Sequence, residues 1–458
     1  MLLQYILAFV VAIAILVTVH ELGHFLVARL CGVKVLRFSL GFGRIVKSWR
    51  IGPDQTEWAI SAIPLGGYVK MLGESDGDEV PEADRGRAFH TQVLYKRSLI
   101  VLAGPFANLL LAAVIYWGFA CVGTQDLPAV VSDVTPQSAF AQAGVQPGDR
   151  IVEVSGQSVR GWSDFKMQVV DQAVGGQTAI LSVDRGGVPV GGLRLDTSAV
   201  VLDETAPDPL SQLGAGSLAL DFNIPAVIDS FQDKSPAAQA GLKAGDEILS
   251  VDGRKISNLA VLVRIVSASA GKTLQVNALR QGQQYAFAVH PLQDSKSKQF
   301  MLGVKCKPDP DAFQAAYSRA AIEVRYGLAD GLVYGVRQTW DMSLFSLKAM
   351  WRIVTGHISM RNVSGPVTIA DYAGKSASAG LGAYLQFLAL ISVSIGVLNL
   401  LPIPILDGGH LLYHAAEFVR GKPLPERIEE YGQRVGMALL AGMMALAFFN
   451  DFNRFFFG

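Results

Sequence analysis

Four apolar stretches constrain this sequence more than any other feature. A helix that spans a bilayer needs about 20 apolar residues. The first three stretches have about that length, and the fourth is shorter, so the alternative for it is a partly interfacial helix. The stretches run from about Leu2 to Phe25, Leu99 to Val122, Ala383 to Leu406 and Val435 to Phe449. Half of the 458 residues are apolar and only 17% are charged, a composition too apolar for an ordinary soluble protein. The sequence therefore predicts a polytopic α-helical membrane protein with four transmembrane helices.

The first stretch and the charges after it predict how the chain crosses the membrane. No Lys or Arg precedes that stretch and no small-residue cleavage site follows it, so we expect it to be retained rather than removed as a signal peptide. Basic residues crowd the loop that follows, at Arg29, Lys34, Arg37, Arg44, Lys47, Arg50, Lys96 and Arg97. Because basic loops stay in the cytoplasm, we expect 29–98 to be cytoplasmic, with both termini and the central region on the other side.

The central region contains a duplicated domain. "AQAGVQPGDRIVEVSG" at 141–156 aligns without a gap with "AQAGLKAGDEILSVDG" at 238–253. In each copy an alternating apolar strand, 151–154 or 248–251, leads into a turn that contains glycine, as in a small β-rich module. The pattern resembles PDZ domains, which bind extended peptide ends by strand addition. We expect PDZ domains at 125–212 and 213–305, with two roles open: peptide binding, or a spacer or gate.

The first apolar stretch contains the motif HELGH at residues 20–24. On a helix, His20 and His24 lie one turn apart on one face, where both imidazoles can bind a single metal ion. Glu21 lies beside them, where a carboxylate can take a proton from the attacking water of a metalloprotease. The alternative is a helix end whose polar side chains are simply solvated. Ionisable groups so close to the hydrocarbon are costly and usually functional, which favours the metal site.

A catalytic zinc ion usually has three protein ligands and one open position, so a third ligand is needed. The segment "NLLPIPILDGGHLLYH", residues 399–414, offers three candidates at the end of the third stretch. Asp407 is one, and His410 and His414, again four residues apart, are the others. The spacing alone does not choose between a site completed by Asp407 and a separate site built on His410 and His414.

Other features exclude some functions. Lys plus Arg and Asp plus Glu number 39 each, and no basic tract carries interleaved aromatics, so nothing indicates a nucleic-acid partner. Cys31, Cys121 and Cys306 are widely spaced and form no CxxC pair, which supports neither a disulfide framework nor a thiolate zinc site.

Residues 306–382 mix aromatic, basic and apolar positions at helical spacing. We expect amphipathic helices at the membrane interface there, with core packing of an extracytoplasmic domain as the alternative.

The motifs resemble those of the site-2 intramembrane metalloproteases, and the bacterial RseP group with tandem PDZ domains in particular. They are HELGH in the first stretch, "GPFAN" in the second, the paired repeats, "NVSGPVTIA" and "NLLPIPILDGGH" around the third, and the C-terminal "FFNDFNR". The resemblance covers almost the whole chain in order. It implies that the Zn2+ ligands are His20, His24 and Asp407. It also implies that Glu21 is the catalytic acid/base, that Asn399 helps to hold the substrate and that His410 is a neighbour rather than a ligand. For Asn399, a hydrogen bond between helices is the alternative explanation of a polar side chain in an apolar span.

The segment "EWAISAIPLGGYVKML", residues 57–72, resembles the membrane-associated β-hairpin of that family. An alternating strand leads into Pro64, the pair Gly66 and Gly67, and then Tyr68. A substrate helix hides its peptide bonds in its own hydrogen bonds, so cleavage requires local unwinding and new partners for the freed backbone. We expect the hairpin to supply these partners by strand addition, with an ordinary cytoplasmic hairpin as the alternative.

The resemblance implies a zinc endopeptidase of the bacterial inner membrane that cuts transmembrane segments of single-pass proteins. Its substrates would include a pre-trimmed anti-sigma factor and remnant signal peptides, with membrane lipid around it and the PDZ pair admitting only trimmed substrates. The expected membrane segments are 1–28 with HExxH, 99–122, 383–410 with LDGG, and 435–450. Two rival functions are a PDZ scaffold with a vestigial metal site and a metal-dependent membrane chaperone or transporter. The intact HExxH motif and Asp407 speak against the scaffold, and the lack of an internal membrane repeat speaks against a transporter.

Overall fold

The computed structural model describes residues 2–74, 80–135, 137–201, 208–217, 226–232, 235–256, 259–293, 300–306, 317–356, 364–422 and 424–457. The chain forms two compact units, one of Met1–Gly123 with Arg325–Gly458 and the other of Thr124–Val324. Two parts of the expected interfacial region, 307–316 and 357–363, lie outside the described residues, as do the first two residues of "NVSGPVTIA".

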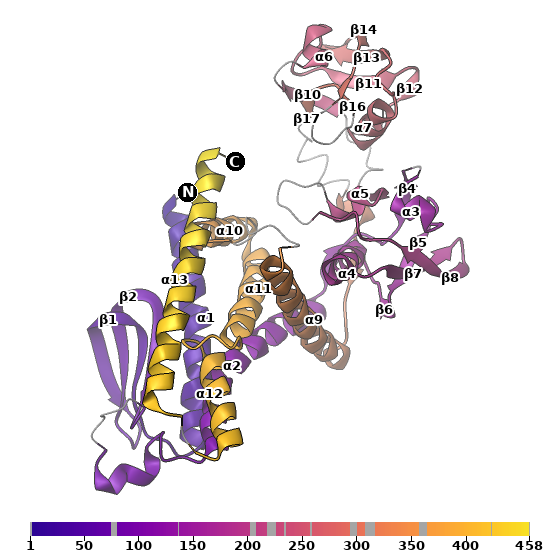
Figure 1. Ribbon diagram of the computed structural model, residues 1–458. Helices are drawn as coiled ribbons and strands as arrows, with labels where there is room; N and C mark the ends of the chain where they lie inside the picture. The colour runs from indigo at the N-terminus through magenta and orange to yellow at the C-terminus, as the bar shows by residue number, and fades with distance from the viewer. Residues whose placement is uncertain are drawn as a thin grey trace. The chain divides into compact units, whose positions relative to one another are not determined.

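The first unit is a bundle of helices (Figure 1). Within the described residues, four helices are long and apolar enough to cross a membrane: α1 (Leu2–Leu30), α2 (Leu94–Val122), α11 (Leu381–Asn399) and α13 (Glu426–Phe457). The other helices of the unit are α9 (Leu328–Val354), α10 (Pro366–Ala379) and α12 (Asp407–Arg420). Helix α2 packs against α1, α9 and α11, so it holds the bundle together. Ala112 of α2, Met342 of α9 and Val393 of α11 form one buried cluster at this junction.

The third apolar helix is shorter than the sequence pattern suggests. The apolar run continues to Leu406, but α11 ends at Asn399. Pro402 and Pro404 lie just beyond that end, and proline lacks the N–H that a helix interior requires. The LDGG motif therefore begins the separate helix α12 at Asp407 instead of ending the third apolar helix. The fourth apolar helix is longer than the sequence pattern suggests, because α13 starts at Glu426 and not near Val435.

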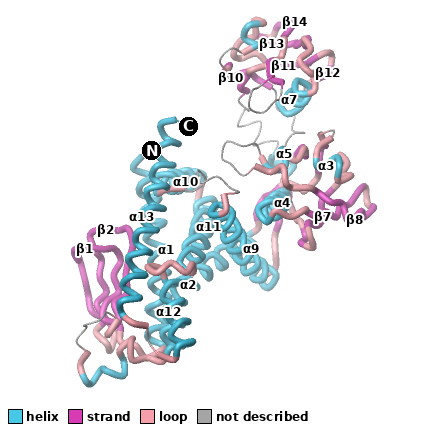
Figure 2. The backbone as a smooth tube through the Cα atoms, in the orientation of Figure 1, coloured by secondary structure: helices cyan, strands magenta, loops and turns pink. Residues whose placement is uncertain are grey.

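Strands β1 (Val35–Ile51) and β2 (Thr56–Met71) form an antiparallel sheet (Figure 2), and both strands contact α1. The segment Arg37–Leu40 pairs both with Gly67–Lys70 and with Glu57–Ile60. Aromatic rings anchor the sheet to the helix. The ring centroid of Phe25 on α1 lies 5.7 Å from that of Phe38 and 5.3 Å from that of Trp58. This packing holds the Gly67–Lys70 segment against the end of α1 that contains HELGH.

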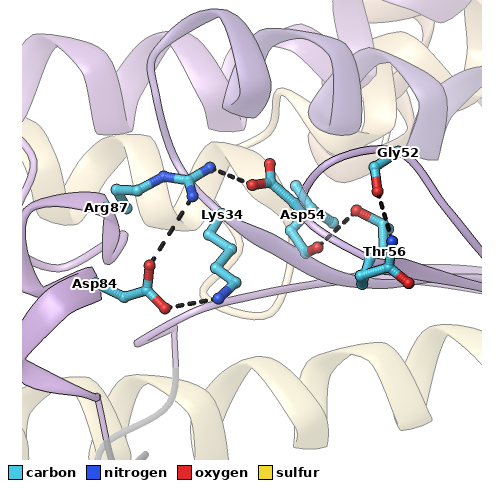
Figure 3. A network of polar contacts seen from close by, with 8 residues as sticks. Lys34, Gly52, Asp54, Thr56, Asp84 and Arg87 are labelled. Carbon is cyan, nitrogen blue, oxygen red and sulfur yellow. Dashed lines mark hydrogen bonds and ion pairs between the residues drawn. The ribbon is translucent and has the colours of Figure 1, made fainter.

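An ion-pair network joins the segments next to β1 and β2 to the residues that follow the sheet (Figure 3). Lys34 Nζ lies 2.6 Å from Asp84 Oδ2, and Arg87 Nη2 lies 2.7 Å from Asp54 Oδ1. Asp84 and Arg87 belong to the 3-10 helix η1 (Glu82–Arg87), which follows β2. Because the four side chains are partly shielded from solvent, the network ties η1 to the sheet rather than leaving it as a free loop.

The second unit contains two β-rich repeats, each with its own core. The first contains β4 (Val131–Val134), β5 (Arg150–Val154), β6 (Gln157–Ser158), β7 (Ala179–Arg185), β8 (Val188–Leu195) and β9 (Ala215–Ser217), with α3 (Ala139–Gln142), α4 (Trp162–Gly175) and α5 (Pro209–Gln212). The second contains β10 (Ala226–Phe231), β11 (Glu247–Val251), β12 (Arg254–Lys255), β13 (Leu274–Arg280), β14 (Gln283–Val289), β15 (Leu292–Gln293), β16 (Phe300–Met301) and β17 (Val304–Cys306), with α6 (Pro236–Gln239) and α7 (Leu259–Ser267). Strands β3 (Thr124–Asp126) and β18 (Ile322–Val324) pair with each other. The strands expected at 151–154 and 248–251 are present as β5 and β11.

Equivalent contacts recur in the two repeats. Buried Asp149 accepts hydrogen bonds from Arg185, at 2.8 Å from both Nε and Nη2. Buried Asp246 accepts the same pair of bonds from Arg280, each at 2.7 Å. Both aspartates belong to the GD pair of the aligned motif, so the sequence duplication corresponds to a duplicated bidentate ion pair.

Candidate metal centre

Three side chains from distant parts of the chain converge inside the helical unit. His20 and His24 lie one turn apart on α1, with their Nε2 atoms 3.2 Å from each other. Asp407 begins α12 and places Oδ2 at 3.2 Å from His20 Nε2 and Oδ1 at 3.6 Å from His24 Nε2. The ligand atoms all lie within 4.8 Å of one another. Among the described residues, this is the only group of three or more His, Cys, Asp or Glu side chains that could share a metal ion.

The spacing of these atoms fits a zinc ion. Zinc binds imidazole nitrogen at about 2.0–2.1 Å with tetrahedral angles, which separates two ligand atoms by roughly 3.3 Å. The observed separations of 3.2 Å match this value. Asp407 Oδ2 is also buried without a hydrogen-bond partner in the described part of the chain. A buried carboxylate oxygen that lacks a donor is costly unless a cation or donor meets it, so the donor set suits a metal ion.

Within the described residues, His410 and His414 are not joined by a third side chain that could complete the rival metal site. His414 is buried, and its Nδ1 lies 3.1 Å from the hydroxyl of Ser98 on α2. His410 is exposed, and neither histidine belongs to a candidate metal group within the described ranges. One turn beyond His414, Glu417 pairs with Arg97 at 2.6 Å. The contacts of Ser98 and Arg97 thus dock α12 on α2, which holds Asp407 in place.

Helix α2 forms the wall behind the histidines. A Cβ atom on Gly104 would lie 2.2 Å from His24 Nε2 and 2.8 Å from His20 Nε2. The helices can approach this closely because Gly23 of α1 faces α2 in the same way, with the Ala103 carbonyl oxygen 2.3 Å from its ideal Cβ position. The motif GPFAN signalled that this segment matters, but the sequence alone did not indicate that its glycine leaves room for the ligand atoms.

The second nitrogen of each imidazole also meets α2. His24 Nδ1 lies 2.8 Å from the carbonyl oxygen of Ile100. His20 Nδ1 lies 3.3 Å from the side-chain amide of Asn108, a fully buried residue. Such outer contacts orient metal-binding histidines and set which ring nitrogen carries the proton. Asn108 is the last residue of the GPFAN motif, so the sequence pointed to the segment but not to a contact with His20. The Ile100 carbonyl was missed because a backbone group has no signature in the sequence.

Glu21 faces a large cavity beside the three ligands. The cavity has a volume of about 930 Å³, and its wall includes Glu21, Tyr68, Arg97 and Glu417. The β2 segment packs directly on Glu21. A Cβ on Gly67 would come within 3.3 Å of the Glu21 Cγ atom, and the Val69 backbone N–H hydrogen-bonds to the Glu21 carboxylate. A carboxylate is thus held next to the candidate ligands, in a space that holds water-sized molecules.

The other residues singled out in the sequence lie around this centre at different distances. Tyr68 lines the cavity, and its hydroxyl accepts a hydrogen bond from Arg37 Nη1 at 3.1 Å. Gly66 has φ +146°, and a side chain there would collide with the ring of Phe42. Pro64 belongs to β2, but its side chain lies outside what the structure describes. Asn399 is the last residue of α11 and, within the described chain, is not part of the cavity wall.

Two histidines one turn apart, completed by a distant carboxylate and flanked by a glutamate, define a protein of the zinc metalloprotease class. The chain belongs to peptidase family M50, whose sequence profile matches residues 8–443. The regulator of sigma-E protease RseP of Escherichia coli is 37% identical over 453 residues, which cover 98% of each chain. A protein of Neisseria meningitidis named as a zinc metalloprotease is 40% identical over 458 residues, covering 98% of this chain and 99% of the relative.

A solved structure was also matched. The PDZ domain of the SdrC-like protein from Listeria monocytogenes is 19% identical, covers 20% of this chain and 93% of that domain, and superposes with a TM-score of 0.17. At that score the similarity supports no conclusion about the fold of either repeat.

Proposed function

We propose that this protein is an intramembrane zinc endopeptidase that hydrolyses transmembrane segments of single-pass membrane proteins. One observation carries the proposal. The HELGH motif lies on α1, a helix long and apolar enough to cross a membrane, and Asp407 reaches its two histidines from the other end of the sequence. A site built between such helices acts on peptide bonds at membrane depth.

The residues have distinct roles in this proposal. His20, His24 and Asp407 hold the zinc ion, which when bound polarises the substrate carbonyl and makes water a stronger acid. Glu21 takes the proton from the attacking water and passes it to the leaving amine. Its contacts with Gly67 and Val69 keep the carboxylate at the cavity rather than turned into the bundle.

Substrate binding is assigned to the edge of β2 beside Glu21. The segment Gly67–Lys70 pairs with β1, so its other edge can pair with an extended substrate. Gly66 and Gly67 let the backbone pass close to Phe42 and Ser39, and Tyr68 faces the cavity. Together with Pro64 and Asn399, these residues would hold an unwound substrate strand next to the metal centre.

The remaining assignments extend the resemblance to RseP. We place the protein in the bacterial inner membrane, surrounded by lipid, with the loop 29–98 and the metal centre toward the cytoplasm and the repeats in the periplasm. The repeats at 125–212 and 213–305 are assigned as PDZ domains that admit trimmed substrates and exclude intact ones. The proposed substrates are a pre-trimmed anti-sigma factor and remnant signal peptides. The region 306–382 is assigned as interfacial. The membrane segments are assigned to α1, α2, α11 and α13, with the bounds that the structure gives them.

The proposal is tested with the purified full chain and a single-pass model substrate in detergent or liposomes. We expect cleavage within the substrate's transmembrane segment, loss of cleavage with a zinc chelator, and recovery when zinc is restored. Cleavage that persists in chelator would exclude the metalloprotease mechanism. Cleavage only outside the apolar segment would exclude intramembrane proteolysis but not the metal centre.

A further inference from the structure

The two histidines of the metal centre differ in what their Nδ1 atoms meet. His24 Nδ1 lies 2.8 Å from the Ile100 carbonyl oxygen, which can only accept a hydrogen bond. The proton of His24 must therefore be on Nδ1, which leaves the Nε2 lone pair directed at the site. A backbone carbonyl cannot rotate away from its helix, so the tautomer of His24 is determined by the fold.

His20 meets the side-chain amide of Asn108, which can present either a donor or an acceptor. In the structure Nδ2 faces His20 Nδ1 at 3.3 Å, while Asn108 Oδ1 is buried and has no hydrogen-bond partner among the described residues. The two ends of an amide have nearly the same shape, so a half-turn about the last side-chain bond exchanges them without moving the backbone.

The two orientations have opposite consequences for His20. If Nδ2 donates to Nδ1, the ring proton must be on Nε2, which lies 3.2 Å from both His24 Nε2 and Asp407 Oδ2. A protonated Nε2 cannot ligate a metal. If Oδ1 faces Nδ1 instead, it accepts the Nδ1 proton, the buried oxygen gains its missing partner, and the Nε2 lone pair faces the metal site.

We propose that Asn108 is a positioning residue of the metal centre, whose side-chain oxygen holds His20 in the Nδ1–H tautomer and so prepares Nε2 to bind zinc. The inference rests on the proposed zinc site. Asn108 is well placed for this task. It is 0% exposed, and its backbone oxygen accepts a 2.7 Å hydrogen bond from the Ser392 hydroxyl of α11. It also lies one turn from Gly104, the residue that borders both Nε2 atoms.

Zinc affinity of the purified full chain, measured by competition with a chromophoric chelator, provides the first test. Asn108→Leu keeps a side chain of similar size and removes the acceptor, and we expect zinc to bind about 10- to 100-fold more weakly. Asn108→Asp supplies a carboxylate oxygen at the same point, and we expect affinity within a few-fold of the wild type. Ser392→Ala removes the hydrogen bond from α11 to the Asn108 backbone oxygen but leaves the Asn108 side chain and the hydrogen bonds of α2 in place, so it is the matched control with near-wild-type affinity.

If Asn108→Leu fails to fold, Asn108→Asp still tests the inference. A carboxylate can only accept a hydrogen bond, so it should keep the His20 proton on Nδ1 and leave Nε2 free for zinc. Weak zinc binding by Asn108→Asp would therefore overturn the inference. Nitrogen NMR of the zinc-free protein, labelled at histidine and assigned with His20→Ala, gives an independent readout. We expect His20 to carry its proton on Nδ1 in the wild type and the aspartate variant, and on Nε2 in the leucine variant. Protonation of Nε2 in the wild type contradicts the proposal.

Failure of this inference is distinguishable from failure of the zinc site. If His20→Ala, His24→Ala and Asp407→Ala all bind zinc as the wild type does, the proposed centre is wrong. If these three variants lose zinc while Asn108→Leu binds it normally, the result supports the proposed zinc site and contradicts only the role of Asn108.

Discussion

A Cβ atom on Gly104 would lie 2.2 Å from Nε2 of His24, so the backbone of α2 borders the proposed metal centre where a side chain would otherwise stand. The same Cβ would be 2.8 Å from His20 Nε2. Both ligand atoms therefore depend on the absence of a single methyl group on a neighbouring helix.

Gly104→Ala should bind zinc at least about 10-fold more weakly and lose most cleavage activity, because the methyl group displaces one or both imidazoles from the ligand positions. Gly118→Ala is the matched control on the same helix, since a Cβ there meets no described atom within 4 Å. Alanine favours a helix by about 1 kcal/mol over glycine, so Gly118→Ala should fold and cleave normally. Equal zinc content and activity in the two variants would show that the α1–α2 contact is looser than described.

Glu21→Gln should retain zinc and the fold yet abolish cleavage. The amide has nearly the size of the carboxylate but cannot accept a proton from the attacking water. Metal analysis and cleavage of a single-pass model substrate are measured on the same preparation. Wild-type turnover in this variant would rule out Glu21 as the acid/base of the protease mechanism.

Asp407→Ala should lower both zinc content and activity, because it removes the carboxylate that lies within 3.2 Å of His20 and 3.6 Å of His24. His414→Ala should leave both nearly intact, since His414 contacts Ser98 and not the ligand group. The reverse pattern in metal analysis would favour the rival site of His410 and His414.

The second repeat should lose stability in acid through Asp246. The hydrogen bonds from Arg280 hold the pKa of the Asp246 carboxyl below its usual value, although burial opposes them and the Lys243 N–H assists them. A carboxyl whose folded pKa lies below its unfolded value of about 3.9 contributes stability above that pH, and the contribution is lost as pH falls through the folded value. We expect amides of β11 and β13 to exchange faster as pH falls below about 4, after correction for the intrinsic rate.

Arg280→Met should remove that acid sensitivity and destabilise the second repeat already at neutral pH, because Asp246 would be buried without its partner. Arg185→Met changes the equivalent pair of the first repeat and should leave exchange in β11 and β13 unchanged, which makes it the control. An Arg280→Met protein with wild-type exchange at pH 7 would mean that the ion pair contributes nothing to the repeat.

Deletion of residues 126–305, with the ends joined by a flexible linker, should leave a membrane unit that still cuts a short substrate, because no proposed ligand or base lies in the deleted segment. The deletion should relax discrimination against substrates that carry a bulky folded extracytoplasmic domain, since a size filter works by steric exclusion. Cleavage of long and trimmed versions of one substrate is compared for both enzymes. Unchanged discrimination would mean that the repeats recruit partners or merely separate the membrane segments.

Much of the architecture followed from local pattern. The apolar stretches predicted α1, α2, α11 and α13, because the length of a membrane-crossing helix is set by the bilayer. The end of α11 was placed wrongly, since hydropathy does not register the prolines that break a helix. The loop 57–72 was expected to form a hairpin, but Arg37–Leu40 pairs with two separate segments of β2, a register that only the folded sheet reveals.

The sequence by itself determined that His20 and His24 share one face and that Glu21 lies beside them, because helical spacing is a local property of the backbone. Only the tertiary structure selected Asp407 over His410 and His414, and only it brought Gly104 and Asn108 to the ligand atoms. These contacts join α1, α2 and α12, whose relative positions depend on side-chain packing between elements far apart in the chain. Spacing within one segment carries no information about such packing. The sequence therefore indicated two ligands of the proposed metal centre, and the fold brought the third next to them.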